Sequence, residues 1–301
     1  MNSKLETIAI IINEYSKDEG LNHTAIQGVH CFKMSQENNK LPVIYRPSIY
    51  VVAQGIKKVM LRDEVFQYSK GNFLAVSVDL PIIGEVIEAT IDNPYLCVQI
   101  DIDAKKISEL AIKLKLCKSS STVAHTGLFV GDTNDNLLDA IARLLKLLEN
   151  PKNIPHLAPL VMEEFYYYLL TSPHGSQIID ASMVTNNVQR ISKVIDTIKS
   201  DLSKTILVDD LAAIANMSPS SFHNQFKKVT TLSPIQYVKR LRLTQARQIM
   251  LSDNMDANTT ARIVGYESAS HFSRDYSKLF GAPPKRDIAK LKLNEDQLHF
   301  L

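Results

Sequence analysis

Two short stretches of the chain place hydrogen-bonding side chains between aromatic residues spaced four apart. The aromatic pairs are Phe222 with Phe226 and, 50 positions later, Phe272 with Tyr276. In a helix this spacing turns the rings to one face and leaves the intervening side chains on the other. Such a polar face suits the major groove of DNA, where Asn pairs with adenine and Arg pairs with guanine or contacts a phosphate. The candidate contact residues are Ser220, Ser221, His223, Asn224, Lys227, Ser270, Ser273, Arg274 and Lys278.

Each stretch follows a short helix and a tight turn, which is the pattern of a helix-turn-helix motif. Asn216 in the first copy and Gly265 in the second stand where the turn needs a residue that tolerates a positive φ. Ser218 predicts an N-cap, and Pro219 predicts the first position of the following helix. The internal repeat predicts a tandem reader of double-stranded DNA. Residues 234–251 predict one long helix between the copies, and a separation of about 34 Å would bring the two readers into successive major grooves.

The same segment resembles the DNA-binding domain of the AraC/XylS family of bacterial transcription regulators. The resemblance is carried by residues 217–222 (MSPSSF), 241–247 (LRLTQAR) and 264–284. The sequence departs from the family pattern where Asn224, Thr231 and Thr260 replace a frequent Arg, Gly and Ile. The resemblance implies a sequence-specific, DNA-binding transcription regulator.

Residues 25–103 consist of short apolar runs separated by turn residues such as Gly55 and Asn93-Pro94. Many short runs at this spacing predict a sandwich or barrel, and we favour a cupin-like β-barrel. The predicted fold class is therefore α+β, with this barrel and a helical dimerisation segment followed by an all-α domain with two helix-turn-helix motifs. The predicted strands are 29–34, 49–54, 57–61, 65–69, 73–78, 85–89 and 96–102.

The strand region also resembles the N-terminal domain of one AraC-type subgroup, through residues 47–59 and 71–81. The resemblance implies a barrel that senses a small molecule, and it leaves the effector unidentified. Closed barrels of this size hold small ligands in their interior. We expect ligand contacts from Tyr50, Phe73 and Cys97 on inner strands.

The sequence contains no constellation typical of an enzyme or a metal site. A metal-binding cupin needs two or three His and a carboxylate from neighbouring strands, and His30 has no partner two residues away. We expect no catalysis, no metal and no cofactor. Cys31, Cys97 and Cys117 form no CxxC pair, so they are either buried apolar residues or thiols of a sensor.

Apolar helices are expected after the strands, at 104–117, 133–148 and 157–170. The apolar stripe between 137 and 148 is wider than packing on one sheet face requires, and it predicts a homodimer helix, with core packing as the alternative. The expected domains are 1–175 for sensing and dimerisation, a linker at 176–185, 186–290 for DNA binding, and a tail at 291–301.

Charge is distributed unevenly along the chain. Residues 186–301 hold 17 Lys and Arg against 11 Asp and Glu, whereas residues 1–185 hold 17 against 21. A basic C-terminal half fits a polyanionic partner.

With no signal peptide and no membrane span in the sequence, a cytoplasmic location is expected. The sequence predicts a DNA-binding regulator controlled by a small molecule in the barrel. The alternative is a ligand-independent activator whose N-terminal domain only dimerises or contacts partners such as RNA polymerase.

Overall fold

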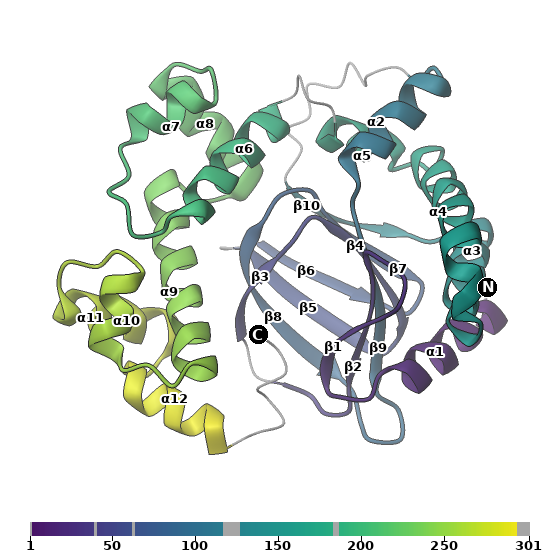
Figure 1. Ribbon diagram of the computed structural model, residues 1–301, viewed down its shortest axis with the longest axis horizontal. Coiled ribbons are helices and arrows are strands. Elements are labelled where there is room, and N and C mark those ends of the chain that lie inside the picture. The colour runs from purple at the N-terminus through teal and green to yellow at the C-terminus, as the bar shows by residue number, and fades with distance from the viewer. Residues whose placement is uncertain (1, 39–40, 62–63, 117–126, 183–186, 294–301) are drawn as a thin grey trace.

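The structure is a computed structural model that describes residues 2–38, 41–61, 64–116, 127–182 and 187–293. Its N-terminal part contains two antiparallel sheets, and its C-terminal part is helical (Figure 1). The first sheet has the strand order β1-β2-β9-β4-β7-β10 and the second has the order β3-β8-β5-β6. The strands are β1 (Gly20–His23), β2 (Val29–Met34), β3 (Leu41–Tyr45), β4 (Ser48–Gln54), β5 (Ile56–Leu61), β6 (Glu64–Ser69), β7 (Asn72–Val76), β8 (Leu80–Glu88), β9 (Tyr95–Asp101) and β10 (Leu128–Asp132).

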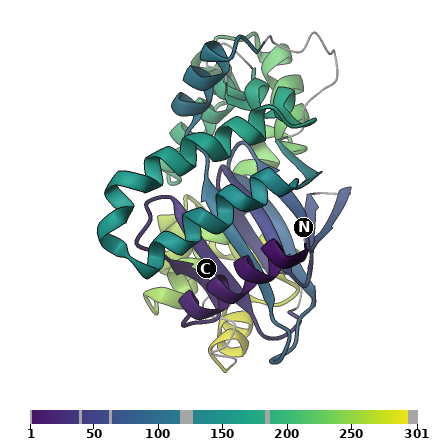
Figure 2. The same ribbon diagram turned by 90° about the vertical axis from the view of Figure 1, so that its right-hand side faces the viewer.

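The six-stranded sheet is covered on both faces. Along β4, Ile49 and Val51 pack with the helices outside the sheet, whereas Tyr50 and Val52 belong to the core between the two sheets. Because side chains alternate along a strand, two covered faces produce one continuous apolar run. The helices of this half gather on the outer side of the sheet (Figure 2). They are α1 (Asn2–Tyr15), α2 (Ala104–Lys113), α3 (Asp135–Lys146), α4 (Ile154–Leu170) and α5 (Gly175–Ser182), with 3₁₀ turns at Leu147–Glu149 and Pro151–Asn153 between α3 and α4. Of these, α1, α3 and α4 run across the face of the sheet (Figure 2).

The predicted α+β class, with antiparallel strands in the first half and an all-α second half, is confirmed, and each predicted strand overlaps an observed one; the strands form two sheets. Three observed strands carry weak signals in the sequence and are not predicted. β1 has only four residues, including Asn22 and His23, and Pro42 interrupts the strand pattern of β3. β10 contains Gly131, which weakens its strand propensity.

The apolar stripe of α3 is buried in the N-terminal core. Leu138, Ile141 and Leu145 are fully buried, and α3 packs between α1 and α4. Core packing therefore accounts for the stripe, which gives no evidence for a dimer. The predicted homodimer stays a prediction without this support.

Part of the predicted linker is helical. Residues 176–182 of the predicted linker belong to α5, where Ile178 and Ile179 are buried in the N-terminal core. This apolar pair anchors the segment to the first half. The remaining linker positions from 183 lie outside the described residues.

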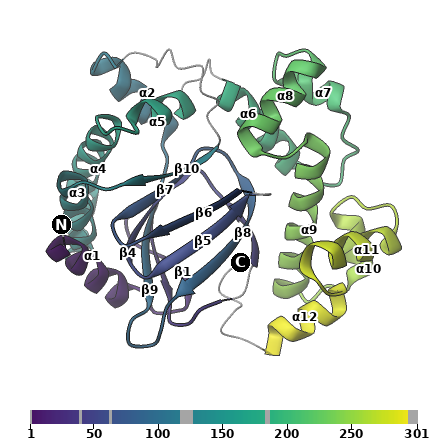
Figure 3. The ribbon, with the colours of Figure 1, turned by 180° about the vertical axis from the view of Figure 1, so that it is seen from behind.

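The C-terminal half contains two helix-turn-helix motifs joined by one long helix (Figure 3). α7 and α8 form the first motif, α10 and α11 form the second, and α9 connects them. None of the helices in the described ranges has an apolar stretch long enough to cross a bilayer. The helices are α6 (Asn187–Ser200), α7 (Val208–Ile214), α8 (Pro219–Thr230), α9 (Pro234–Ser252), α10 (Ala257–Ile263), α11 (Ala269–Phe280) and α12 (Pro284–Leu293), the last of which reaches into the predicted tail.

Candidate nucleic-acid interface and ligand cavity

The polar face of α8 is exposed and its aromatic face is buried. Phe222 and Phe226 are fully buried. Ser218 caps the helix by accepting a hydrogen bond from the backbone amide of Ser221 at 3.4 Å, and Pro219 follows at the first helical position, as predicted. The exposed residues include every predicted contact of the first motif: Ser220, Ser221, His223, Asn224 and Lys227.

α11 presents a similar face. Ser270, Arg274 and Lys278 are exposed, and Ser273 is half-buried. The carboxylate of Asp275 accepts from Nζ of Lys239 at 3.0 Å and lies 3.3 Å from Nε2 of His271. Arg274 forms no ion pair with any residue that the structure describes. Its guanidinium is therefore available to a base or a phosphate.

The backbone confirms the predicted turns and reveals one strained position. Asn216 has φ +52° and Gly265 has φ +81°. α8 and α11, the second helices of the two motifs, each end in the left-handed region, at Thr231 (φ +61°) and, 50 positions later, at Gly281 (φ +78°). A β-branched residue rarely adopts this conformation. Oγ1 of Thr231 is also buried with no hydrogen-bond partner among the described residues, so the first motif carries strain that the second lacks.

Replacing Thr231 by Gly is expected to stabilise the protein by about 1 kcal/mol, because relief of left-handed strain exceeds the added entropy of the unfolded chain. The urea midpoint of the helical signal measures this change. The reverse substitution, Gly281→Thr, is a matched control, because an added Cβ there meets nothing within 4 Å and only strain acts. A lower midpoint for Thr231→Gly would show that the threonine makes a compensating contact.

Arg242 on α9 links the second motif to the segment before the first. Its guanidinium donates to the carbonyl oxygen of Lys204 at 2.7 Å and to that of Gly265 at 3.1 Å. Lys204 precedes the first motif, and Gly265 forms the turn of the second. One side chain thus joins α9 to the second motif and to the loop that leads into the first.

A buried ion pair attaches α12 to α9. Arg247 donates two hydrogen bonds of 2.9 Å to the two carboxylate oxygens of Asp287. The hydroxyl of Tyr276 on α11 donates to the same carboxylate at 2.8 Å. Burial is the main cause that raises the pKa of Tyr276, and the negative charge of Asp287 raises it further. This network fixes α11 against α9 and α12.

The helical half packs directly against the sheets. The hydroxyl of Tyr237 on α9 donates to the carbonyl oxygen of Asp79 at 2.6 Å. The Asp79 carboxylate accepts from Nζ of Lys199 on α6 at 2.9 Å. The amide of Gly127 donates to the carbonyl oxygen of Val229 at 2.8 Å. These contacts connect α6, α8 and α9 to the N-terminal half.

A cavity of about 380 Å³ lies between the two sheets and reaches the helical half. Its wall combines five aromatic residues with many polar and charged ones, and the rings of Tyr45 and Tyr50 stack with centroids 4.8 Å apart. The size of the cavity is typical of small-molecule sites. The helical half contributes Lys199, Thr244, Gln245 and Gln248 to the lining.

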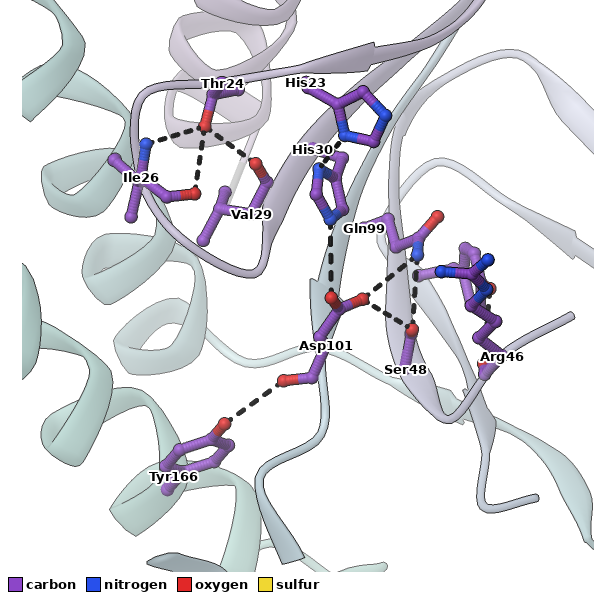
Figure 4. A network of polar contacts seen from close by, with 11 residues as sticks. His23, Thr24, Ile26, Val29, His30, Arg46, Ser48, Gln99, Asp101 and Tyr166 are labelled. Carbon is purple, nitrogen blue, oxygen red and sulfur yellow. Dashed lines mark hydrogen bonds and ion pairs between the residues drawn. The ribbon is translucent and has the colours of Figure 1, made fainter. Parts of the chain in front are cut away.

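A polar network lies at one edge of this cavity (Figure 4). Nδ1 of His23 is 3.0 Å from Nδ1 of His30, and Nε2 of His30 is 3.4 Å from the Asp101 carboxylate. That carboxylate also accepts from Ser48 at 3.1 Å and from Gln99 at 3.2 Å. Burial alone would raise the pKa of Asp101, but the hydrogen bonds, led by His30, hold it below its ordinary value.

Lys57 on β5 points into the cavity from the buried face of its strand. The side chain is 8% exposed, and Val59 and Leu61 share its face. Its Nζ lies 4.3 Å from the ring centroid of Phe32 and 5.5 Å from those of Tyr45 and Tyr95. Each ring contact contributes roughly 0.5–2 kcal/mol, whereas burying an ammonium costs several kcal/mol. Together the three contacts are of the same order as this cost, roughly 1.5–6 kcal/mol, but none of them neutralises the charge.

The structure brings two of the three predicted ligand residues together. Tyr50 and Cys97 line the cavity. The prediction that Phe73 contacts a ligand in the interior is wrong. Phe73 packs against Phe129 and His174 on the helix-covered face of the sheet, whereas its neighbour Leu74 faces the interior.

The two described cysteines behave as buried apolar residues. Burial raises the pKa of Cys97 to about 11 and that of Cys31 to about 12. Both thiols stay protonated at neutral pH and are poor nucleophiles, which disfavours thiol sensing. Cys117 lies outside the described residues.

Lys57 and Thr244 are cavity residues that the sequence analysis does not identify. A lysine in register with Val59 and Leu61 is a readable signal for an inward charge. Thr244 gives no such signal, because its place depends on how α9 packs against the sheets.

In the part of the chain that the structure describes, no group of three or more His, Cys, Asp or Glu is arranged to hold a metal ion.

Comparison with known proteins agrees with this architecture. The family model for the AraC-type transcriptional regulator N-terminus matches residues 25–177, and that for a helix-turn-helix domain matches residues 211–289. The regulator GbdR of Pseudomonas aeruginosa is 28% identical over 130 residues, which cover 43% of this chain and only 35% of the length of GbdR. The lactose operon transcription activator of Staphylococcus xylosus is 22% identical over 242 residues, which cover 79% of this chain and 82% of that protein.

Solved structures of ToxT from Vibrio cholerae share the fold. One at 12% identity has a TM-score of 0.57 and covers 86% of this chain and 97% of ToxT. Another, at 11% identity with a TM-score of 0.55 and coverage of 87% and 93%, is described as bound to an unsaturated fatty acid. The N-terminal match alone covers half of the chain, and the two helix-turn-helix motifs follow it in the expected order. The chain belongs to the AraC/XylS family of transcription regulators.

Proposed function

We propose that the protein is a sequence-specific DNA-binding transcription regulator whose DNA affinity is set by a small molecule in the cavity between the sheets. The observation that carries the proposal is the composition of the cavity wall. Thr244, Gln245 and Gln248 of the wall belong to α9, the helix that carries both helix-turn-helix motifs. An occupant would therefore contact the element that sets the spacing of the two readers.

DNA binding rests on the two exposed polar faces. α8 offers Asn224 and His223 beside short serines, and α11 offers Arg274 with no competing ion pair among the described residues. We assign Asn224 to an adenine, and Arg274 to a guanine or a phosphate. Lys227 and Lys278 are assigned to phosphates, which contribute affinity and salt dependence without base preference.

Ligand control rests on the contacts beside the cavity. Asp79 and Lys199 line it, and their ion pair joins the residue before β8 to α6 where the halves meet. A ligand shifts an equilibrium only when it contacts two conformations differently. An occupant that touches both halves meets this condition. The fatty acid in the ToxT structure is a precedent for a small-molecule ligand on this fold.

The test fills the cavity without touching the DNA-facing helices. A Cβ added at Gly84 would meet only ordinary contacts, the nearest being Cε of Lys57 at 3.7 Å, so Gly84→Ala is tolerated and Gly84→Leu occupies cavity space. A genome-wide footprint of the full chain supplies a target fragment. DNA affinity is then measured with and without a small-molecule filtrate of the host cells. The wild type and Gly84→Ala are expected to change affinity by at least about fivefold with the filtrate, and Gly84→Leu is expected to show no response.

The alternative is a ligand-independent activator whose N-terminal half only dimerises or contacts proteins such as RNA polymerase. It predicts that the wild type and both Gly84 variants have the same DNA affinity with and without the filtrate. An equal response from Gly84→Leu and the wild type would place the effector outside the cavity. The absence of any footprint would contradict DNA binding itself.

A further inference from the structure

The cavity contains a buried cation without a carboxylate partner. The described charged residues of its wall, histidines aside, are three cations, Arg46, Lys57 and Lys199, and two carboxylates, Asp79 and Asp101. Asp79 is engaged by Lys199, and Asp101 by His30 and its neighbours. Lys57 is more than nine-tenths buried and forms no ion pair with any described residue.

The surroundings of Lys57 favour an anionic group beside it. The faces of Phe32, Tyr45 and Tyr95 attract the ammonium but neutralise none of its charge. A buried charge is ordinarily paired and hydrogen-bonded. A carboxylate of a ligand in the cavity would accept hydrogen bonds from Nζ and cancel the charge.

The aromatic part of the wall favours a ligand with a flat body. It consists of the rings of Phe32, Tyr45, Tyr50, Tyr68 and Tyr95. Tyr45 and Tyr50 already stack on each other, and aromatic pairs prefer offset or edge-to-face contact with a further ring. On the α9 side, Oγ1 of Thr244 is buried with no hydrogen-bond partner among the described residues, and Thr244 lines the cavity. It offers one polar contact to a ligand in the cavity.

We propose that the cavity binds a small aromatic carboxylic acid and that Lys57 binds its carboxylate. This inference rests on the proposed ligand control and names the chemical class of the effector. Lys57 is then the residue that selects acids over neutral molecules of the same shape.

The test compares acids with their amides, which have nearly the same shape and no charge. The probes are benzoate, 4-hydroxybenzoate, phenylacetate and indole-3-acetate, each paired with its primary amide, and binding to the full chain is measured by calorimetry and by the shift in Tm. At least one acid is expected to bind roughly 10- to 100-fold more tightly than its amide, because hydrogen bonds to charged groups are the stronger ones.

Three variants separate a binding role of Lys57 from a structural one. Lys57→Met is expected to abolish the preference for the acid, and Lys57→Arg is expected to retain part of it. Lys58→Met is the matched control, because Lys58 is the next residue of β5 and faces away from the cavity, across from Glu85. It is expected to bind the probes as the wild type does.

The inference is overturned if no probe acid binds more tightly than its amide, or if Lys57→Met keeps the preference. Either result leaves the proposed function intact. The filtrate can still change the DNA affinity of the wild type, and Gly84→Leu can still lack that response. If instead an acid binds through Lys57 while DNA affinity stays the same with and without that acid, the ligand class stands and the proposed control fails.

Discussion

Replacing Asp287 by Asn is expected to lower the free energy of unfolding of the helical half by about 3–5 kcal/mol, because it leaves the buried Arg247 without its counter-charge. Arg247 is 5% exposed and Asp287 is 6% exposed, so water cannot replace the lost partner. The hydroxyl of Tyr276 also loses its charged acceptor. Urea unfolding followed by helical circular dichroism measures the change.

Two comparisons show whether the ion pair itself is responsible. Asp253→Asn removes one carboxylate from the exposed end of α9 and is expected to change stability by less than about 0.5 kcal/mol. The double variant Arg247→Met with Asp287→Leu is expected to recover much of the loss, because well-packed apolar residues often replace a buried pair without penalty. A loss below about 1 kcal/mol for Asp287→Asn alone would mean that the domain reorganises to hydrate Arg247.

The helix-turn-helix repeat could be predicted because its signals are local. Ser218 and Pro219 start a helix by their own chemistry, and Asn216 adopts a positive φ that its side chain tolerates. The aromatic spacing of Phe222 and Phe226 selects the buried face without reference to any distant residue. A sequence window of eleven residues, 216–226, therefore contains the information that the first motif needs.

The cavity could be predicted only in part, because its lining depends on strand register. Phe73 and Leu74 are adjacent apolar residues of β7, and pairing with β4 and β10 decides which one faces inward. An added Cβ at Gly131 of β10 would lie 2.5 Å from the ring of Phe73, so this glycine makes room for the ring on the outer face. Since β10 is not itself predicted, the sequence offers no means of choosing between the two positions.

Contacts between the two halves could not be predicted from the sequence either. Tyr237 and Asp79 are far apart along the chain, yet the Tyr237 hydroxyl is 2.6 Å from the Asp79 carbonyl oxygen. The place of α9 beside the cavity follows from such contacts and from the packing of α9 against β3 and β8. The proposed link between the ligand and DNA binding thus depends on tertiary contacts, which neither the strand region nor the helix-turn-helix repeat reveals in its own sequence.

The two reading helices are expected to contribute different parts of DNA recognition, and two substitutions test this division. Asn224→Ala is expected to relax base preference at one position by about 1–3 kcal/mol, with little change in salt dependence, because a neutral amide releases no counterions. Arg274→Ala is expected to relax preference one helical turn away; if Arg274 holds only a phosphate, it weakens all sites and lowers the salt slope by about one unit.

Binding of each variant to a panel of single-base site variants, at two salt concentrations, distinguishes these outcomes. Lys227→Ala and Lys278→Ala are the references for pure phosphate loss, because they remove charge from the same two helices. A local role for Arg274 has no support in the geometry, since the nearby Asp275 is paired with Lys239 at 3.0 Å. If Asn224→Ala and Arg274→Ala both leave affinity and preference unchanged, α8 and α11 do not read the bases. The internal repeat would then not be a tandem reader of DNA, and the exposed polar faces of α8 and α11 would have another partner.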